Sequence, residues 1–139
     1  MAIQSEPLQR PLAVMMHRTF RTISPDTTLL EAAKLMREAR VGALLVHETN
    51  RSGQYRGIVS ETDLVRKGMA ESCPAQDTSV SAVMTSPLLS IEITSSAHEA
   101  SDKMAEHGIR HLAISQDGQI VGIISVRDLL RYFKNWGGL

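Results

Sequence analysis

The chain has 139 residues, of which 42% are hydrophobic and 22% charged, and this is the composition of an ordinary soluble globular protein. Basic and acidic residues both number 15, so no bulk positive charge exists to attract nucleic acid or an anionic membrane surface. The single cysteine, Cys73, cannot form an internal disulfide, and no apolar run has the length of a signal peptide or a membrane-spanning helix. We therefore expect a cytoplasmic protein that holds any anionic ligand in a local site.

An internal duplication organises the chain, and each copy is expected to form strand, helix, strand, strand, helix. Residues of the same kind recur 68 positions further along as far as Leu44 and Leu112, after which the offset falls to 65. The matched pairs include Met16 and Met84, Ile23 and Ile91, Thr28 and Ser96, Glu31 and Glu99, and Met36 and Met104. We predict an N-terminal arm over 1–11, a first copy over 12–69, a linker over 70–79, a second copy over 80–135 and a C-terminal tail over 136–139.

The first half of each copy reads as a short strand followed by a helix. The strands are expected around Phe20–Ile23 and Leu88–Ile91. Capping boxes then begin the helices, because a hydroxyl and a glutamate three residues later can satisfy the first free N–H groups. The boxes are Thr28 with Glu31 and Ser96 with Glu99. Apolar stripes at helical spacing follow: Leu29, Ala32, Ala33 and Met36 in the first copy, and Ala97, Ala100 and Met104 in the second.

The second half of each copy reads as a hairpin and a closing helix. Ala43–Glu48 is expected to pair with Tyr55–Ser60 across a loop over Thr49–Gln54. Leu112–Ser115 is expected to pair with Ile120–Ser125 around Asp117-Gly118, a strong signal for a two-residue turn. Ser60 and Ser125 then open the last helices. Because half the chain has only a modest core, we expect an α/β fold in which two β-α-β-β-α copies pack their sheets together about a pseudo-twofold axis.

The start of each closing helix is a candidate ligand site. Ser60 and Ser125 lie where free backbone N–H groups point outward, and Asp63 and Asp128 follow three residues later on the same rim. A carboxylate can accept hydrogen bonds from both hydroxyls of a ribose, while serine and free amides can bind phosphate oxygens. The same Ser-x-x-Asp pattern is also a plain N-terminal helix cap, so the residues alone leave both interpretations open.

With these motifs in place, the chain resembles the CBS-domain family over about residues 12–68 and 80–134, as a stand-alone tandem pair (Bateman module) of bacterial or archaeal type. The resemblance rests on Val83-Met84 and the looser Met15-Met16, on Glu31-Ala32 and Glu99-Ala100, and on the closing G-h-x-S-x-x-D-L pattern of both copies. It implies a regulatory module with two clefts at the repeat interface that bind an adenine nucleotide, with the aspartate on the ribose. The candidate ligands are AMP, ADP, ATP, S-adenosylmethionine and NAD. No catalysis and no required cofactor are expected.

The two clefts are predicted to differ. The second copy carries Arg110-His111 at the entrance to its strand and Arg127 inside the closing motif, where the first copy has Gly42-Ala43 and Thr62. The resemblance implies that such a basic pair contacts phosphate, which makes the cleft of Asp128 the better candidate. Arg110 or His111 could instead serve the other cleft or be ordinary surface charges.

By analogy with the family, the adenine lies in an apolar slot. The slot residues would be Leu88, Ile109 and Ile123 in the second copy, and Phe20, Val41 and Ile58 in the first. Simple core packing is the plainer role for all of them, and it is compatible with a place in the slot.

Two functions remain open at this point. The first is a sensor whose ligand shifts the packing of the repeats and regulates an unknown partner. The second is a structural dimerisation module without a ligand. The resemblance, the Ala-rich stripe and the aromatic segment Leu130–Trp136 predict a homodimer, although that segment could instead close over its own core. The five histidines show no metal-ligand spacing, so no metal site is expected.

Overall fold

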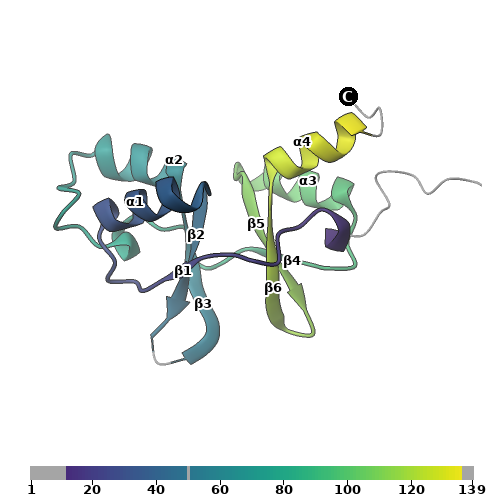
Figure 1. The fold of residues 1–139 in the computed structure, drawn as a ribbon, viewed down its shortest axis with the longest axis horizontal. Coiled ribbons are helices and arrows are strands. Elements are labelled where there is room, and N and C mark those ends of the chain that lie inside the picture. Colours follow the sequence, from purple (N-terminus) through teal and green to yellow (C-terminus); the bar gives the residue numbers. More distant parts are fainter. Residues whose placement is uncertain (1–11, 50, 136–139) are drawn as a thin grey trace, which may run out of the picture. The chain divides into compact units, whose positions relative to one another are not determined.

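The computed structural model describes residues 12–49 and 51–135 and contains two compact units (Figure 1). The first unit is Phe20–Leu89, and the second unit combines the described residues up to Thr19 with those from Ser90 onward. Each unit has one three-stranded sheet with helices, so the expected α/β class is confirmed. The predicted N-terminal arm over 1–11 and C-terminal tail over 136–139 lie outside the described residues.

In the first unit a parallel strand pair is extended by an antiparallel hairpin. The strand order is β1-β2-β3, with β1 parallel to β2 and β2 antiparallel to β3. A buried apolar cluster that includes Leu44, Val46 and Val59 joins this sheet to its helices. The elements are β1 (Thr22–Ile23), α1 (Leu29–Ala39), β2 (Ala43–Glu48), β3 (Arg51–Ser60), α2 (Glu61–Asp63) and a π-helical segment that continues α2 (Leu64–Met69).

Capping residues at both ends set the limits of helix α1. The Thr28 hydroxyl accepts a hydrogen bond from the Glu31 N–H at 3.1 Å, and Arg40 ends the helix in the left-handed conformation. The Glu31 carboxylate accepts from the Thr28 hydroxyl, so this cap differs from the reciprocal box expected. The predicted stripe is wrong at Ala33, which is exposed because the helix meets the sheet along one side of that stripe. The buried members are Leu29, Ala32 and Met36.

The second unit repeats this architecture with a cleaner hairpin. Its strand order is β4-β5-β6, again parallel and then antiparallel. Asp117 and Gly118 have φ values of 51° and 77°, so the predicted two-residue turn is confirmed. The predicted stripe of the first helix is also confirmed, since Ala97, Ala100 and Met104 are buried. The elements are β4 (Ser90–Glu92), α3 (Ala97–His107), β5 (His111–Gln116), β6 (Gln119–Ser125) and α4 (Val126–Asn135).

The first hairpin differs from the prediction. We expected a loop over Thr49–Gln54, but β3 already begins at Arg51. The extra residues of this copy are absorbed by irregular pairing, with register shifts on both sides of His47. A β-bulge of this kind accommodates unequal strand lengths while most of the backbone hydrogen bonds are kept. The opening strands β1 and β4 also begin two residues later than predicted.

The opening segment of each copy pairs with the last strand of the other copy. His17 and Ile123 exchange backbone hydrogen bonds of 2.9 and 3.0 Å within the second unit. Thr85 and Ile58 do the same within the first unit, at 2.8 and 3.0 Å. The approach is close: a Cβ on Gly122 would lie 2.8 Å from the His17 carbonyl oxygen. Each compact unit therefore contains residues from both copies.

The segment predicted as a linker packs against the start of α1. The Leu29 and Leu30 N–H groups donate to the carbonyl oxygens of Thr78 and Ala75, at 2.9 and 3.0 Å. These are N–H groups that a helix start leaves without intrahelical partners. Val80, in the short 3-10 helix Val80–Ala82, is fully buried. The segment therefore caps a helix, and Val80 directly after it contributes to the core of the first unit.

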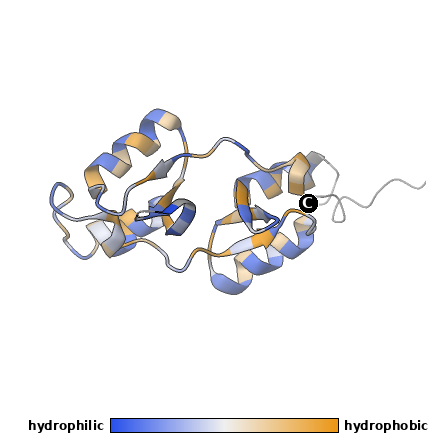
Figure 2. Cartoon of the chain, turned by 90° about the horizontal axis from the view of Figure 1, so that it is seen from below, coloured by the Kyte–Doolittle hydropathy of each residue, from blue (hydrophilic) through white to orange (hydrophobic). Residues whose placement is uncertain are grey.

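Apolar and polar residues alternate along the helices of both units, as expected for helices that place one face on a sheet (Figure 2). No helix among the described residues has the length and hydropathy needed to cross a bilayer.

Candidate functional site

Two buried aspartates lie at the starts of the closing helices. The side chain of Ser125 accepts a hydrogen bond from the Asp128 N–H at 3.2 Å. Asp128 Oδ2 in turn accepts from the Ser125 N–H at 2.8 Å and from its hydroxyl at 2.9 Å. Ser60 and Asp63 form the same reciprocal cap, with distances of 3.2, 2.9 and 3.1 Å. Both Ser-x-x-Asp motifs are therefore helix caps in this structure, whatever else they bind.

The other oxygen of each carboxylate is held by a residue from the opening segment. Asp128 Oδ1 lies 2.8 Å from His17 Nε2, and because a carboxylate only accepts, the imidazole is the donor. In the first unit the Thr85 hydroxyl donates to Asp63 Oδ1 at 3.3 Å, and Lys67 Nζ lies 3.1 Å from the same oxygen. His17 and Thr85 are equivalent positions of the duplication, 68 residues apart. The two units thus complete the same cap with different chemistry.

Burial makes these contacts energetically important. Asp63 and Asp128 are 5% and 7% exposed, and they are the buried charged residues of the described chain. Removing a carboxylate from water is costly unless hydrogen bonds replace the lost hydration. The cap, the opening segment and, for Asp63, an ammonium group provide that replacement. An ionised carboxylate has about four acceptor positions, and Asp128 uses three of them here.

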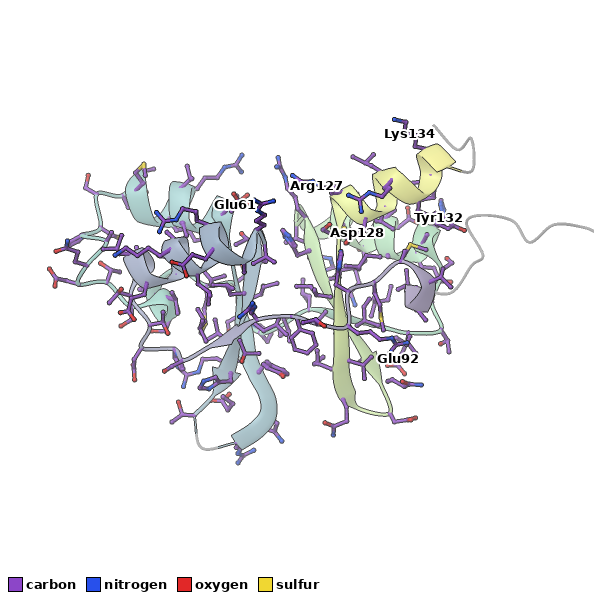
Figure 3. All side chains as sticks on the ribbon, in the orientation of Figure 1. Glu61, Glu92, Arg127, Asp128, Tyr132 and Lys134 are labelled. Carbon is purple, nitrogen blue, oxygen red and sulfur yellow. The ribbon has the colours of Figure 1, made fainter. Side chains whose placement is uncertain are left out.

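The basic residues predicted for the second copy lie at the same edge as Asp128. His111 pairs with Ser125 across the β5–β6 ladder, and the Val126 N–H donates to the Arg110 carbonyl oxygen at 2.9 Å. Arg127 is exposed and lies beside Asp128 at the start of α4 (Figure 3). The backbone pairing therefore places Arg110, His111, Ser125, Arg127 and Asp128 at the same edge of the second unit. In the first unit the corresponding group is Gly42, Ala43, Ser60, Thr62 and Asp63.

The predicted adenine slot of the second copy is not gathered in one unit. Leu88 belongs to the first unit, whereas Ile109 and Ile123 belong to the second. Ile123 lies on β6, where it pairs with His17, and Ile109 lines a groove on the helical face. We grouped these three residues in the prediction because they belong to one copy, but the boundaries of the compact units differ from those of the copies.

The predicted slot of the first copy lies within one unit, where two of its members serve the core. Val41 packs against the buried cluster, and Ile58 is 9% exposed and bridged to Thr85. The Phe20 ring meets the Tyr55 ring edge to face, with centroids 6.2 Å apart. Val41 and Ile58 therefore contribute to core packing, a role that the sequence left open for them.

A separate apolar groove lies between α3 and α4 of the second unit. Its volume is about 440 Å³, and Arg110 is the charged residue among those that line it. Leu130, one of the lining residues, is 49% exposed. The apolar side chains of this α3–α4 groove are Met104, Ile109, Val126, Leu129, Leu130 and Phe133.

Sequence reasoning missed His17, Thr85 and Lys67 as neighbours of the two aspartates. The duplication offered one usable signal, because it places His17 and Thr85 at equivalent positions directly after the matched methionines Met16 and Met84. No spacing rule connects His17 with a carboxylate 111 residues away. Among the described residues, no group of three histidine, cysteine, aspartate or glutamate side chains is placed to hold a metal ion.

A model of the CBS domain family matches residues 12–70 and 80–135. Among curated proteins, the CBS domain-containing protein YhcV of Bacillus subtilis (strain 168) is 38% identical over 108 residues, which are 78% of this chain and 74% of that protein. The matched regions cover 56% and 64% of two further relatives, so part of each extends beyond the similarity.

Solved structures show the same fold. A crystal structure of an uncharacterized conserved protein from Pyrococcus horikoshii has a TM-score of 0.82 at 33% identity, covering 89% of this chain and 92% of that one. The CBS domain protein PAE2072 from Pyrobaculum aerophilum, complexed with AMP, has a TM-score of 0.77 at 26% identity, covering 86% and 89%.

Proposed function

Since the chain belongs to the CBS-domain family, we propose that it is a non-catalytic regulatory module that binds an adenine nucleotide through the rim around Asp128. The observation that carries the proposal is the Asp128 carboxylate, which is buried at a helix start yet keeps one acceptor position, on a rim that also carries Arg110, His111 and Arg127. The AMP complex of PAE2072 supports the ligand class, because that protein shares the fold. The same class includes ADP, ATP, S-adenosylmethionine and NAD.

Each part of the ligand has a chemical counterpart at this rim. The ribose hydroxyls would donate hydrogen bonds to Asp128, which is the carboxylate acceptor among the rim residues. The phosphate would meet Arg110, Arg127 and the N-terminal end of α4, where the helix dipole favours an anion. Guanidinium groups bind phosphate through two hydrogen bonds at once, which adds orientation to charge.

We propose that the second unit is the stronger site. Its rim carries Arg110, His111 and Arg127, whereas the corresponding rim of the first unit offers Gly42, Ala43 and Thr62. Asp63 is also already paired with the Lys67 ammonium, at 3.1 Å. A ligand hydroxyl that approached Asp63 would have to compete with that charge.

Titration calorimetry with AMP on the wild type, Asp128→Asn and Asp63→Asn tests this proposal. Asparagine keeps the size of the side chain and an oxygen that can accept from the serine N–H, so the cap and the fold should survive. We expect Asp128→Asn to weaken AMP binding more than Asp63→Asn does. A thermal-shift series with AMP, ADP, ATP, S-adenosylmethionine and NAD compares the ligands, since binding to the native state raises the melting temperature. Wild type that binds none of them at millimolar concentration would refute the proposal in favour of a structural module.

A homodimer is the second part of the proposal, and the α3–α4 groove supports it. Exposed charged side chains on α4 are basic (Arg127, Arg131 and Lys134), whereas α3 exposes Glu99, Asp102 and Glu106. A second copy related by a twofold axis would place the basic flank of the groove against the acidic flank of its partner and cover Leu130. Sedimentation equilibrium at tens of micromolar measures the assembly. A single species near 15.3 kDa would contradict it.

A further inference from the structure

The two equivalent positions His17 and Thr85 differ in one property, because imidazole changes charge near neutral pH and a hydroxyl does not. We propose that His17 competes with the ligand for Asp128, so that ligand binding at the second unit strengthens as the pH rises. This inference rests on the proposed function, in which Asp128 accepts hydrogen bonds from a ribose.

The competition follows from the number of acceptor positions on Asp128. Oδ2 already accepts two hydrogen bonds from Ser125, at 2.8 and 2.9 Å, and these hold the start of α4. Oδ1 accepts one from His17 at 2.8 Å. With about two acceptor positions on each oxygen, one position remains on Oδ1. A ribose that donates through two hydroxyls therefore needs the position that His17 occupies.

The His17 side chain can move away from Asp128 without disturbing the core. Its side chain is 58% exposed, whereas that of Asp128 is 6% exposed. The ring can therefore turn into solvent while the backbone bridge to Ile123 remains. The carboxylate cannot follow, since the cap fixes it. The displaced group is thus His17, and the fixed group is Asp128.

The protonation state of His17 determines the free-energy cost of displacing its ring from Asp128. A protonated imidazole makes a charge-assisted hydrogen bond to the carboxylate, about twice as strong as the bond from a neutral ring. At low pH the ligand must break the stronger bond, and at high pH the weaker one. The ligand affinity therefore rises with pH as the imidazole loses its proton.

The other charged groups at this edge do not supply the same dependence. They are Arg127 from α4, Arg110 and His111 at the start of β5, and Arg18 on the segment of His17, while β6 carries no charged residue. Arginine keeps its charge while histidine titrates. A protonated His111 would favour a phosphate and so act in the opposite direction. Adenosine, which has no phosphate, removes that contribution from the measurement.

Calorimetry with adenosine at pH 5.5, 6.5 and 7.5 on the wild type, His17→Gln and His98→Gln tests the proposal. Glutamine keeps an N–H donor for Asp128 but cannot titrate. His98 is the matched control, because it is an exposed histidine whose Nε2 lies 3.4 Å from exposed Asp102 on α3. We expect wild type and His98→Gln to bind about fivefold more tightly at pH 7.5 than at pH 5.5. His17→Gln should show no such change.

The outcomes separate this inference from the function on which it rests. Wild type that binds adenosine equally at the three pH values would overturn the role of His17 and leave the nucleotide site standing. The same holds if His17→Gln retains the full pH dependence, or if His98→Gln loses it. Wild type that binds neither adenosine nor AMP at any pH would overturn both. Thermal unfolding of each variant confirms that the folded protein is compared; if His17→Gln does not fold, His17→Thr, which copies the natural residue at the equivalent position 85, replaces it.

Discussion

Removal of the Asp128 side chain should destabilise the protein far more than removal of an ordinary surface carboxylate. The change Asp128→Ala deletes the acceptor of three hydrogen bonds, two from Ser125 and one from His17. It thereby removes the carboxylate half of the reciprocal cap of α4, while the Ser125 hydroxyl can still accept from the N–H of residue 128. It also releases the side-chain contact between the opening segment and the second unit. Both losses occur at a buried site, since the Asp128 side chain is 6% exposed.

The magnitude follows from these three contacts. A net hydrogen bond contributes about 0.5–1.5 kcal/mol, and one to a charged group about 1.5–3 kcal/mol. Loss of a whole N-terminal cap costs about 0.5–2 kcal/mol, and Asp128→Ala loses only part of it, because the Ser125 hydroxyl still accepts from the N–H of residue 128. The hydrogen bond from His17 contributes an energy at the lower end of the range for hydrogen bonds, because the His17 side chain is 58% exposed and water competes for the bond. We therefore expect Asp128→Ala to lower the free energy of unfolding by about 2–4 kcal/mol.

Urea unfolding followed by far-ultraviolet circular dichroism at pH 7.5 measures this loss. Asp102→Ala is the matched control, since Asp102 lies on the exposed face of α3 with its side chain 70% exposed. That change should alter the free energy of unfolding by less than about 0.5 kcal/mol. Amide hydrogen exchange should accelerate at the start of α4 in Asp128→Ala alone. Equal losses in the two variants would refute the reasoning that the buried carboxylate holds both the helix and the opening segment.

Two further predictions address the rim and the bridged strand. Arg110→Ala should weaken AMP binding by about tenfold and change adenosine binding little, because a charge-assisted contact to phosphate is worth about 1.5–3 kcal/mol; calorimetry with both ligands decides, and equal losses would mean that the arginine shapes the pocket. Gly122→Ala should lower the free energy of unfolding by about 1–3 kcal/mol, because the new Cβ would lie 2.8 Å from the His17 carbonyl oxygen and 3.0 Å from the Met16 sulfur. Urea unfolding measures that change, and a variant as stable as wild type would show that the opening segment moves freely away from β6.

Some features of the fold were predictable because short stretches of sequence encode them. Asp117-Gly118 predicted a two-residue turn, and both residues adopt the positive φ that this turn requires. Thr28 and Ser96 predicted the starts of α1 and α3, and each accepts a hydrogen bond from the N–H three residues later. The errors at this level were local too. Ala33 lies at the edge of its stripe, and β3 extends to Arg51 through irregular pairing that no turn signal announces.

The candidate site was predictable only in part. The Ser-x-x-Asp motifs located both buried carboxylates, because a cap joins residues three apart. Their second partners were not predictable from local spacing, and neither was the assignment of Leu88 to one compact unit and of Ile109 and Ile123 to the other. Both features depend on the compact units, which combine residues from both copies, whereas the sequence pattern shows only the copies.

The sequence by itself determined the duplication, the α/β class, the caps and the position of each buried aspartate, since each depends on residues a few positions apart or on a repeated pattern. Only the tertiary structure decided that each opening segment pairs, through an isolated β-bridge, with the last strand of the other copy. That exchange places His17 beside Asp128 across 111 positions of sequence. The physical reason is that an edge strand offers backbone N–H and C=O groups to any segment that reaches it, and side-chain pattern does not record which segment does.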